Sequence, residues 1–211
     1  MSRSAPEPLT TPRVARAAAW LARRDADLAR LHARHGPPPL WARRPGFATL
    51  AHIILEQQVS LASARSMRRR LARELGRFDA ASFARAGERG LIRLGVTRQK
   101  SRYLAGAAGA VRGGAFDLPA LAGYDDETAT SALVALDGIG PWTAQVYLVM
   151  ALRRPDVWPR GDLALLKAMA KAKRVRGRLT DERAHGIAER WRPWRAVAAR
   201  MLWQDYLAER R

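Results

Sequence analysis

The chain has 211 residues, of which 38 are Lys or Arg and 19 are Asp or Glu, so its formal net charge is +19. It contains no cysteine, which excludes disulfides, thiolate zinc sites, iron–sulfur clusters and a cysteine nucleophile. No uncharged apolar run approaches the ~18 residues of a membrane span, and the first residues lack the pattern of a secretory signal. We therefore expect a cytoplasmic protein with a polyanionic partner, nucleic acid first, although solvated helix faces in an Arg-rich composition also explain the charge.

Helical periodicity dominates the chain after a short N-terminal segment. Residues 1–12 hold three prolines and predict a flexible tail. Apolar residues near the helical period then run from Val14 to Leu31 and stop at the Gly-Pro-Pro-Pro of 36–39. A second apolar stretch covers 47–55, and Ser60 is placed to cap a helix over 61–75. Further helical segments, separated by glycines and loops, are expected at 82–86, 89–94, 98–111, 125–136, 142–152 and 163–173, before two C-terminal helices that start near Thr180 and Pro193. Sustained period-2 alternation is absent, which predicts an all-α fold of roughly ten short helices.

The segment Leu136-Asp-Gly-Ile-Gly-Pro-Trp-Thr-Ala144 is the most informative one. Gly138 and Gly140 allow a tight turn in which backbone N–H groups point outward at the start of a helix, a geometry that suits an anion such as phosphate. Ile139 between them would insert into the core. A Gly-x-Gly pair alone also fits an ordinary turn between helices, but the longer pattern is more restrictive.

Four segments together resemble a known family. The hairpin, with the loop Val157–Gly161 and Asp162 after it, resembles the helix-hairpin-helix (HhH-GPD) superfamily of base-excision DNA glycosylases. Ile54–Ser60 and Trp191–Trp203 are similar to its 3-methyladenine DNA glycosylase II branch. The resemblance implies a monofunctional glycosylase that flips alkylated or deaminated purines out of duplex DNA and hydrolyses their N-glycosidic bond in base excision repair. It also implies two helical subdomains flanking a cleft as one catalytic unit, which we expect at 13–46 with 164–211 and at 47–163.

Asp162 is the expected catalytic residue. Breaking a glycosidic bond builds positive charge on the sugar, and a carboxylate on the face opposite the departing base can stabilise that charge and orient a water. The resemblance implies this role for Asp162. An Asp directly before a helix is also a good N-cap, so capping alone is the simpler explanation, and the two roles are compatible.

Aromatic residues provide the expected base pocket, since a flipped base must stack on something. Trp142 and Trp203 match family positions that line this pocket. Bifunctional relatives carry a nucleophilic lysine where this chain has Trp142, so the resemblance implies no lyase activity. The family's pocket tyrosine corresponds to Val146 here, and Tyr147 would face about 100° away on a helix. Tyr147 is therefore expected in the pocket only if the helix is rotated.

The expected DNA contacts lie around the hairpin and at the turn after 47–55. By the resemblance, Gln57 and Gln58 match the wedge that replaces the flipped nucleotide, with Gln58 the better match, although an exposed loop glutamine is an equally simple explanation. Gly138, Ile139, Gly140, Thr143 and Arg160 are expected to bind DNA. Further candidates for phosphate contacts are Arg65, Arg68, Arg69, Arg98, Lys100, Arg153 and Arg154.

The resemblance also sets the expected cofactors and partners. Backbone carbonyls of Leu136, Gly138 and Ile139 would hold a monovalent cation, Na⁺ or K⁺, while no cofactor is required and no iron–sulfur cluster can form. The expected partner is damaged double-stranded DNA, bound by a monomer at the bacterial nucleoid and not at a membrane. Two other interpretations stay open. A non-catalytic helix-hairpin-helix DNA-binding protein would leave Asp162 and Trp203 unexplained, and a basic RNA-binding or ribosome-associated protein is favoured only by the charge.

Overall fold

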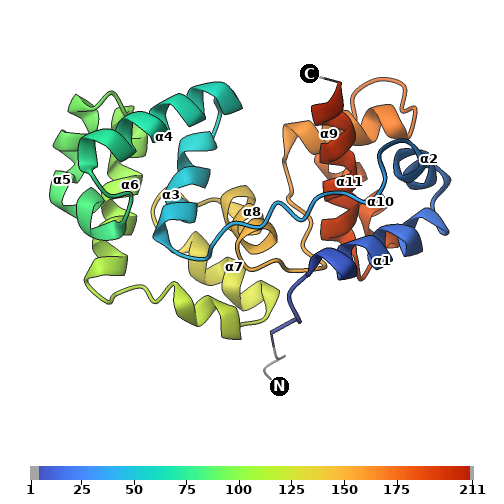
Figure 1. The fold of residues 1–211 in the computed structure, drawn as a ribbon, viewed down its shortest axis with the longest axis horizontal. Coiled ribbons are helices and arrows are strands. Elements are labelled where there is room, and N and C mark those ends of the chain that lie inside the picture. The colour runs from blue at the N-terminus through green and yellow to red at the C-terminus, as the bar shows by residue number, and fades with distance from the viewer. Residues whose placement is uncertain (1–4, 210–211) are drawn as a thin grey trace. The chain divides into compact units, whose positions relative to one another are not determined.

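The computed structural model describes residues 5–209, and within that range the chain is helical with no β-strand (Figure 1). The all-α expectation is confirmed. None of the described helices is both long and apolar enough to cross a membrane. The elements are α1 (Thr11–Ala22), α2 (Ala26–His35), α3 (Phe47–Glu56), α4 (Leu61–Leu75), α5 (Ala80–Arg93), α6 (Arg98–Arg112), η1 (Pro119–Gly123), α7 (Asp126–Val134), α8 (Pro141–Met150), α9 (Leu163–Ala172), α10 (Asp181–Ala188), η2 (Glu189–Trp191) and α11 (Arg195–Ala208).

The chain divides into two compact units, and the division differs from the predicted one. Residues 43–147 form the first unit, and residues 6–42 with those from 148 onward form the second. The expected boundary at 163 is therefore wrong, because residues 148–163 belong to the second unit. The boundary falls inside the continuous helix α8, which carries no Gly or Pro after Pro141 to signal it.

The first unit is built around α3. This helix is apolar on nearly all sides, and its side chains at Leu50, Ile53 and Ile54 are fully buried. Each such aliphatic side chain contributes about 1.5–3 kcal/mol when removed from water. Helix α3 packs on α4 and α6, and α5 pairs with α6. Phe83 of α5 closes this core, with its ring edge-on to those of Phe47 and Phe78.

The second unit is built around α11, which packs on α1, α2 and α9. Its residues from Ala196 to Trp203 are all buried, as expected for a helix surrounded by others. This run includes a buried charge, Arg200, whose guanidinium donates to the carbonyls of Leu40 at 3.0 Å, Ala196 at 3.0 Å and Val149 at 2.6 Å. Burial lowers the pKa of Arg200 to about 10. The side chain thus stays cationic at neutral pH and ties α11 to the C-terminal end of α8.

The N-terminal segment departs from the expected tail. Residues 1–4 lie outside the described range, but Leu9 is fully buried and its N–H donates to the carbonyl of Arg153 at 2.8 Å. Helix α1 begins at Thr11 with Thr10 as its cap. Within the described part of 1–12, Leu9 is therefore a buried apolar anchor, although most of the residues around it are exposed.

The helical pattern expected from Val14 to Leu31 is interrupted. Asp25 begins a second helix, α2, by accepting the backbone N–H groups of Asp27 at 3.0 Å and Leu28 at 3.2 Å. Leu21 and Leu28 are two helical turns apart, so the periodicity continues across the break and hides it. The expected segments 82–86 and 89–94 correspond to α5 and its C-cap, Leu94, and within α5 Gly87 has a non-helical φ of 60°.

Candidate functional site

Asp162 and Trp203 lie together in the second unit. Asp162 is 9% exposed and caps α9, with its Oδ1 accepting the Leu165 N–H at 2.8 Å. The same oxygen accepts the indole N–H of Trp203 at 3.3 Å. Two donors on one oxygen fix the orientation of the carboxylate. The structure thus brings together the predicted catalytic residue and one predicted pocket aromatic, and the capping role of Asp162 is confirmed.

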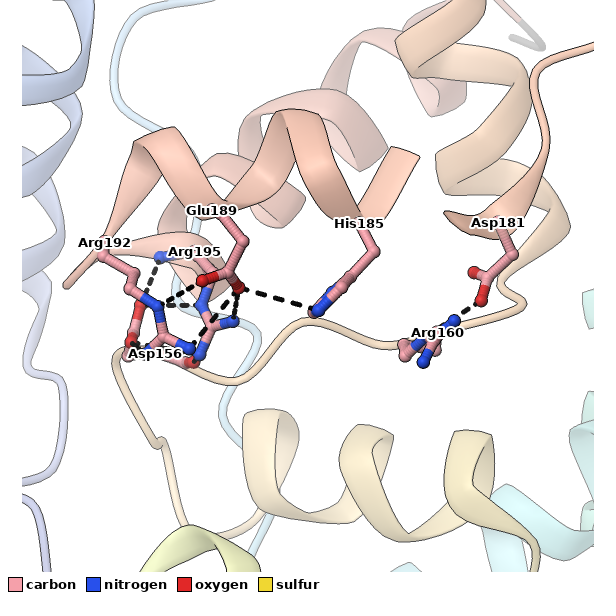
Figure 2. Close-up of polar contacts among 7 residues, drawn as sticks. All are labelled: Asp156, Arg160, Asp181, His185, Glu189, Arg192 and Arg195. Atoms are coloured by element: carbon pink, nitrogen blue, oxygen red, sulfur yellow. Dashed lines mark hydrogen bonds and ion pairs between the residues drawn. The ribbon is translucent and has the colours of Figure 1, made fainter. Parts of the chain in front are cut away.

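The loop that leads to Asp162 is held at Asp156 (Figure 2). The Asp156 carboxylate accepts the backbone N–H of Arg195 at 3.2 Å, its Nε at 3.0 Å, and Nη1 of Arg192 at 2.9 Å. Arg195 also donates to the Asp156 carbonyl at 2.7 Å. Glu189 completes the cluster, and its hydrogen bond from Arg192 holds the pKa of Glu189 below its usual range. These contacts fix the start of the loop against the N-terminal end of α11.

The hairpin in the first unit has the geometry that its glycines predict. Gly138 has a φ of +78°, and a Cβ there would lie 2.0 Å from Cγ of Tyr103. The Tyr103 ring therefore packs directly on the turn, which only glycine allows. Ile139 is 3% exposed, as its expected insertion into the core requires. Gly140 is exposed, and a methyl group added there would meet no atom within 4 Å, so the backbone at this point is open to a ligand.

Gln57 and Gln58 have different environments in the turn between α3 and α4. The Gln57 amide donates to the Gly138 carbonyl at 3.1 Å and to Oγ1 of Thr143 at 2.9 Å. Gln57 therefore connects the turn to the hairpin. Gln58 is exposed with a φ of +53°, and Val59 and Leu61 beside it are about half exposed. Of the two glutamines, only Gln58 is exposed, so the wedge stays a prediction for Gln58.

Lys100 holds the same turn from α6. Its Nζ donates to the carbonyls of Leu55 at 2.9 Å and Gln57 at 2.7 Å, the open end of helix α3. Burial of the amine lowers the pKa of Lys100. Lys100 is therefore a structural cap and not a phosphate contact as expected. Arg154 is also excluded from that role, since it is 1% exposed and donates to the Pro6 carbonyl at 3.3 Å.

The remaining pocket candidates lie on α8. Trp142 is half-buried in the first turn of this helix. Tyr147 is fully buried, and its hydroxyl accepts the Gly46 N–H at 2.8 Å. Burial of that hydroxyl raises the pKa of Tyr147. Tyr147 thus fixes the segment before α3, which argues against its expected role as a substitute for the pocket tyrosine at Val146.

The cation site predicted at the hairpin would consist of backbone carbonyl oxygens, with no carboxylate among its ligands. The Leu136 carbonyl accepts the Ile139 N–H at 3.1 Å, and the Gly138 carbonyl accepts the Gln57 amide. Each carbonyl oxygen has a second lone pair, so these contacts leave room for coordination. Asp137 is paired with Arg102 at 3.0 Å. Residues 5–209 hold no group of three or more His, Asp or Glu side chains that could bind a metal ion.

Sequence reasoning missed Tyr103, which contacts the hairpin, and it gave Lys100 a phosphate contact in place of its contact with the turn. Both lie in the first turns of α6, and their partners are distant in the sequence. A helical period does not indicate which face meets a hairpin. The one available signal was Gly138, because a glycine with positive φ in a tight motif often marks close packing.

An all-helical fold in which a glycine hairpin joins two helices, with an Asp-capped helix after the next loop, defines the helix-hairpin-helix class. Residues 51–193 match the HhH-GPD superfamily base excision DNA repair protein family, and the chain belongs to that family. It is 42% identical over 83 residues to the Mycobacterium tuberculosis probable bifunctional transcriptional activator/DNA repair enzyme AlkA, covering 39% of this chain and 16% of that protein.

Two further comparisons extend over most of the chain. The DNA-3-methyladenine glycosylase of Bacillus subtilis is 26% identical over 170 residues, 75% of this chain and 56% of its own length. The chain thus spans about half the length of that relative and less of the mycobacterial one. The Schizosaccharomyces pombe 3-methyladenine DNA glycosylase Mag1, solved in complex with abasic DNA, aligns with a TM-score of 0.80 at 23% identity over 89% of this chain and 95% of that one. This structural likeness shows the shared fold.

Proposed function

We propose that the protein is a monofunctional DNA glycosylase that releases alkylated purines of the 3-methyladenine kind, or deaminated purines, from duplex DNA in base excision repair. The observation that carries the proposal is the Asp162 carboxylate, held by the Leu165 and Trp203 N–H groups on a segment that matches the family. The named glycosylase relatives support the same activity. We expect the protein to act as a monomer. Its action on chromosomal DNA would place it at the nucleoid.

In the proposed reaction, the N-glycosidic bond breaks with its electron pair leaving on the base, and water adds to the sugar C1′. Asp162 stabilises the positive charge that develops on the sugar and orients the water. The water passes its proton to the Asp162 carboxylate, which releases it to solvent or, for an uncharged purine, to the departing base. Trp203, beside Asp162, stacks on the flipped base, and its indole face favours a cationic alkylated purine by about 0.5–2 kcal/mol. Because Trp142 replaces the lysine of bifunctional enzymes, the product is an intact strand with an abasic site.

We propose that DNA binding centres on the hairpin and the turn. Gln58 fills the space that the flipped nucleotide leaves. Gln57 and Thr143 hold the turn that carries Gln58. Backbone groups of Gly138, Ile139 and Gly140 approach a phosphate. The carbonyls of Leu136, Gly138 and Ile139 would hold Na⁺ or K⁺ there, since neutral carbonyl oxygens suit a monovalent cation.

A gel assay tests this function. A duplex that contains hypoxanthine or 3-methyladenine is incubated with the protein and then split into samples with and without hot alkali. We expect strand breaks after alkali and none before it. Breaks before alkali would reveal a lyase, whereas lesion-DNA binding without any break would favour the non-catalytic binding protein. Preference for structured RNA over abasic-analogue DNA would favour the RNA-binding alternative.

Asp162→Asn separates catalysis from capping. Asparagine is as good an N-cap as aspartate, so the free energy of unfolding should stay close to that of the wild type. Loss of the charge should slow single-turnover base release by at least about 100-fold, while abasic-analogue duplex still binds. Base release at the wild-type rate would refute the assigned role.

A further inference from the structure

A second carboxylate, Asp181, holds the end of the loop that precedes Asp162 (Figure 2). Its Oδ1 accepts the backbone N–H of Gly161 at 2.6 Å, and its Oδ2 accepts Nε of Arg160 at 2.9 Å. These are the two residues immediately before Asp162. The loop is therefore fixed at both ends, by Asp156 at its start and by Asp181 at its end.

The contact with Gly161 acts where the chain turns. Gly161 has a φ of +72°, and the next residue caps α9 with its side chain. Glycine can adopt other backbone conformations at this position, and these would direct the following residue elsewhere. The hydrogen bond from Gly161 selects one of them, and so selects the position from which the Asp162 carboxylate extends.

Asp181 is itself firmly placed. It is the first residue of α10, which Thr180 caps, and α10 packs on α9. Its side chain is 25% exposed, whereas that of the adjacent Glu182 is 80% exposed and lies 3.9 Å from Arg160. Asp181 thus binds the loop, and the adjacent Glu182 provides a matched control.

Arg160 has a different role in this arrangement from the one expected. Its side chain is ion-paired with Asp181, so a phosphate would have to compete for it. The Nε contact with Asp181 lets the guanidinium support the loop, and because the Arg160 side chain is 43% exposed, its contact with DNA stays a prediction.

We propose that Asp181 is a positioning residue for base release, which sets the geometry of Asp162 through Gly161 and Arg160. This inference rests on the proposed function. A misplaced catalytic group loses the advantage of orientation, and a shift of ~1 Å can slow a reaction about 100-fold. Asp181 should therefore govern the rate of the chemical step and not the affinity for DNA.

The test compares single-turnover base release from a hypoxanthine duplex with binding to an abasic-analogue duplex. We expect Asp181→Ala to slow base release by about 10- to 100-fold with unchanged binding. Asp181→Asn keeps an acceptor for Gly161 and should restore most of the rate. Glu182→Ala removes one negative charge from the same helical turn and should match the wild type. Arg160→Ala removes the ion pair but keeps the acceptor for Gly161, so its effect should be smaller than that of Asp181→Ala.

The outcomes distinguish this inference from the function on which it rests. No base release by the wild type overturns both. An Asp181→Ala rate equal to that of an active wild type, or an equal loss in Glu182→Ala, overturns the positioning role alone. If Asp181→Ala does not fold, hydrogen exchange at the Gly161 amide decides: we expect protection of that amide in the wild type, in Glu182→Ala and in Asp181→Asn, which keeps the acceptor, and an unprotected wild-type amide overturns the inference.

Discussion

Asp25 joins three segments that are distant in the sequence. Its Oδ1 caps α2, while its Oδ2 accepts Nζ of Lys173 at 2.6 Å and the indole N–H of Trp191 at 2.8 Å. Burial of the carboxyl acts to raise its pKa, but the hydrogen bonds from Lys173 and Trp191 outweigh it and hold the pKa of Asp25 below 3.8. This carboxylate therefore stabilises the second unit only while it is ionised.

The sign of its pH dependence follows from linkage. A carboxyl whose pKa is lower in the folded state contributes stability above its unfolded pKa and loses it as the pH falls through the folded pKa. Asp25→Asn should lower the free energy of unfolding by about 2 kcal/mol at pH 7. As the pH falls from 5.5 to about 3, the free energy of unfolding should decrease less in this variant than in the wild type. Urea unfolding at both pH values measures this. Asp117→Asn, at an exposed aspartate whose Oδ1 accepts the Ala120 N–H at 3.1 Å, is the charge control. An unchanged acid profile in Asp25→Asn would show that other carboxyls carry the effect.

At the scale of the elements, the hairpin depends on Gly138 and Gly140 in different ways. Gly138 has a positive φ, and a methyl group added there would clash with the Tyr103 ring. A methyl group added at Gly140 would meet nothing within 4 Å. Gly138→Ala should thus lower the free energy of unfolding by about 2–4 kcal/mol through backbone strain and overpacking.

Gly140→Ala is the matched control in the same turn. It should change the free energy of unfolding by less than about 1 kcal/mol, yet weaken binding of abasic-analogue DNA, because its methyl stands where the backbone would approach a phosphate. Urea unfolding and a binding titration on both variants separate the two effects. Equal stability of the two variants would show that Tyr103 moves aside.

Features that depend on contacts between neighbouring residues could be predicted from the sequence. Features that depend on contacts between residues far apart in the sequence could not. Helix α4 has the expected bounds, because the Ser60 hydroxyl accepts the Ser63 N–H three residues away. The contacts that Gln57 makes with Gly138 and Thr143 span more than 80 residues, and no periodicity encodes them. The same holds for Asp181, which is 20 residues from Gly161. Motifs thus indicated Asp162 and the hairpin, but not the side chains that support them.

For the whole molecule, the count of 38 Lys and Arg side chains overstates the cations available to DNA. Many arginines are paired within the protein, including Arg192 and Arg195 with Asp156 and Glu189. Others are buried, as Arg154 and Arg200 are. The cations that can meet phosphates are therefore fewer than 38, and they include the exposed Arg65 and Arg69 of α4.

The salt dependence of DNA binding measures how many cations meet phosphates. Each contact releases counterions and adds about −0.9 to the slope of log K against log salt concentration. Arg65→Gln and Arg69→Gln should each reduce the magnitude of the slope by about 0.9 if they contact phosphates. Arg73→Gln, on the same helix but paired with Glu74 at 2.8 Å, should leave it nearly unchanged, because that pair is already neutralised. Titrations of abasic-analogue duplex at several salt concentrations give the slopes. Equal slopes for all three variants and the wild type would place the phosphate contacts elsewhere than on α4.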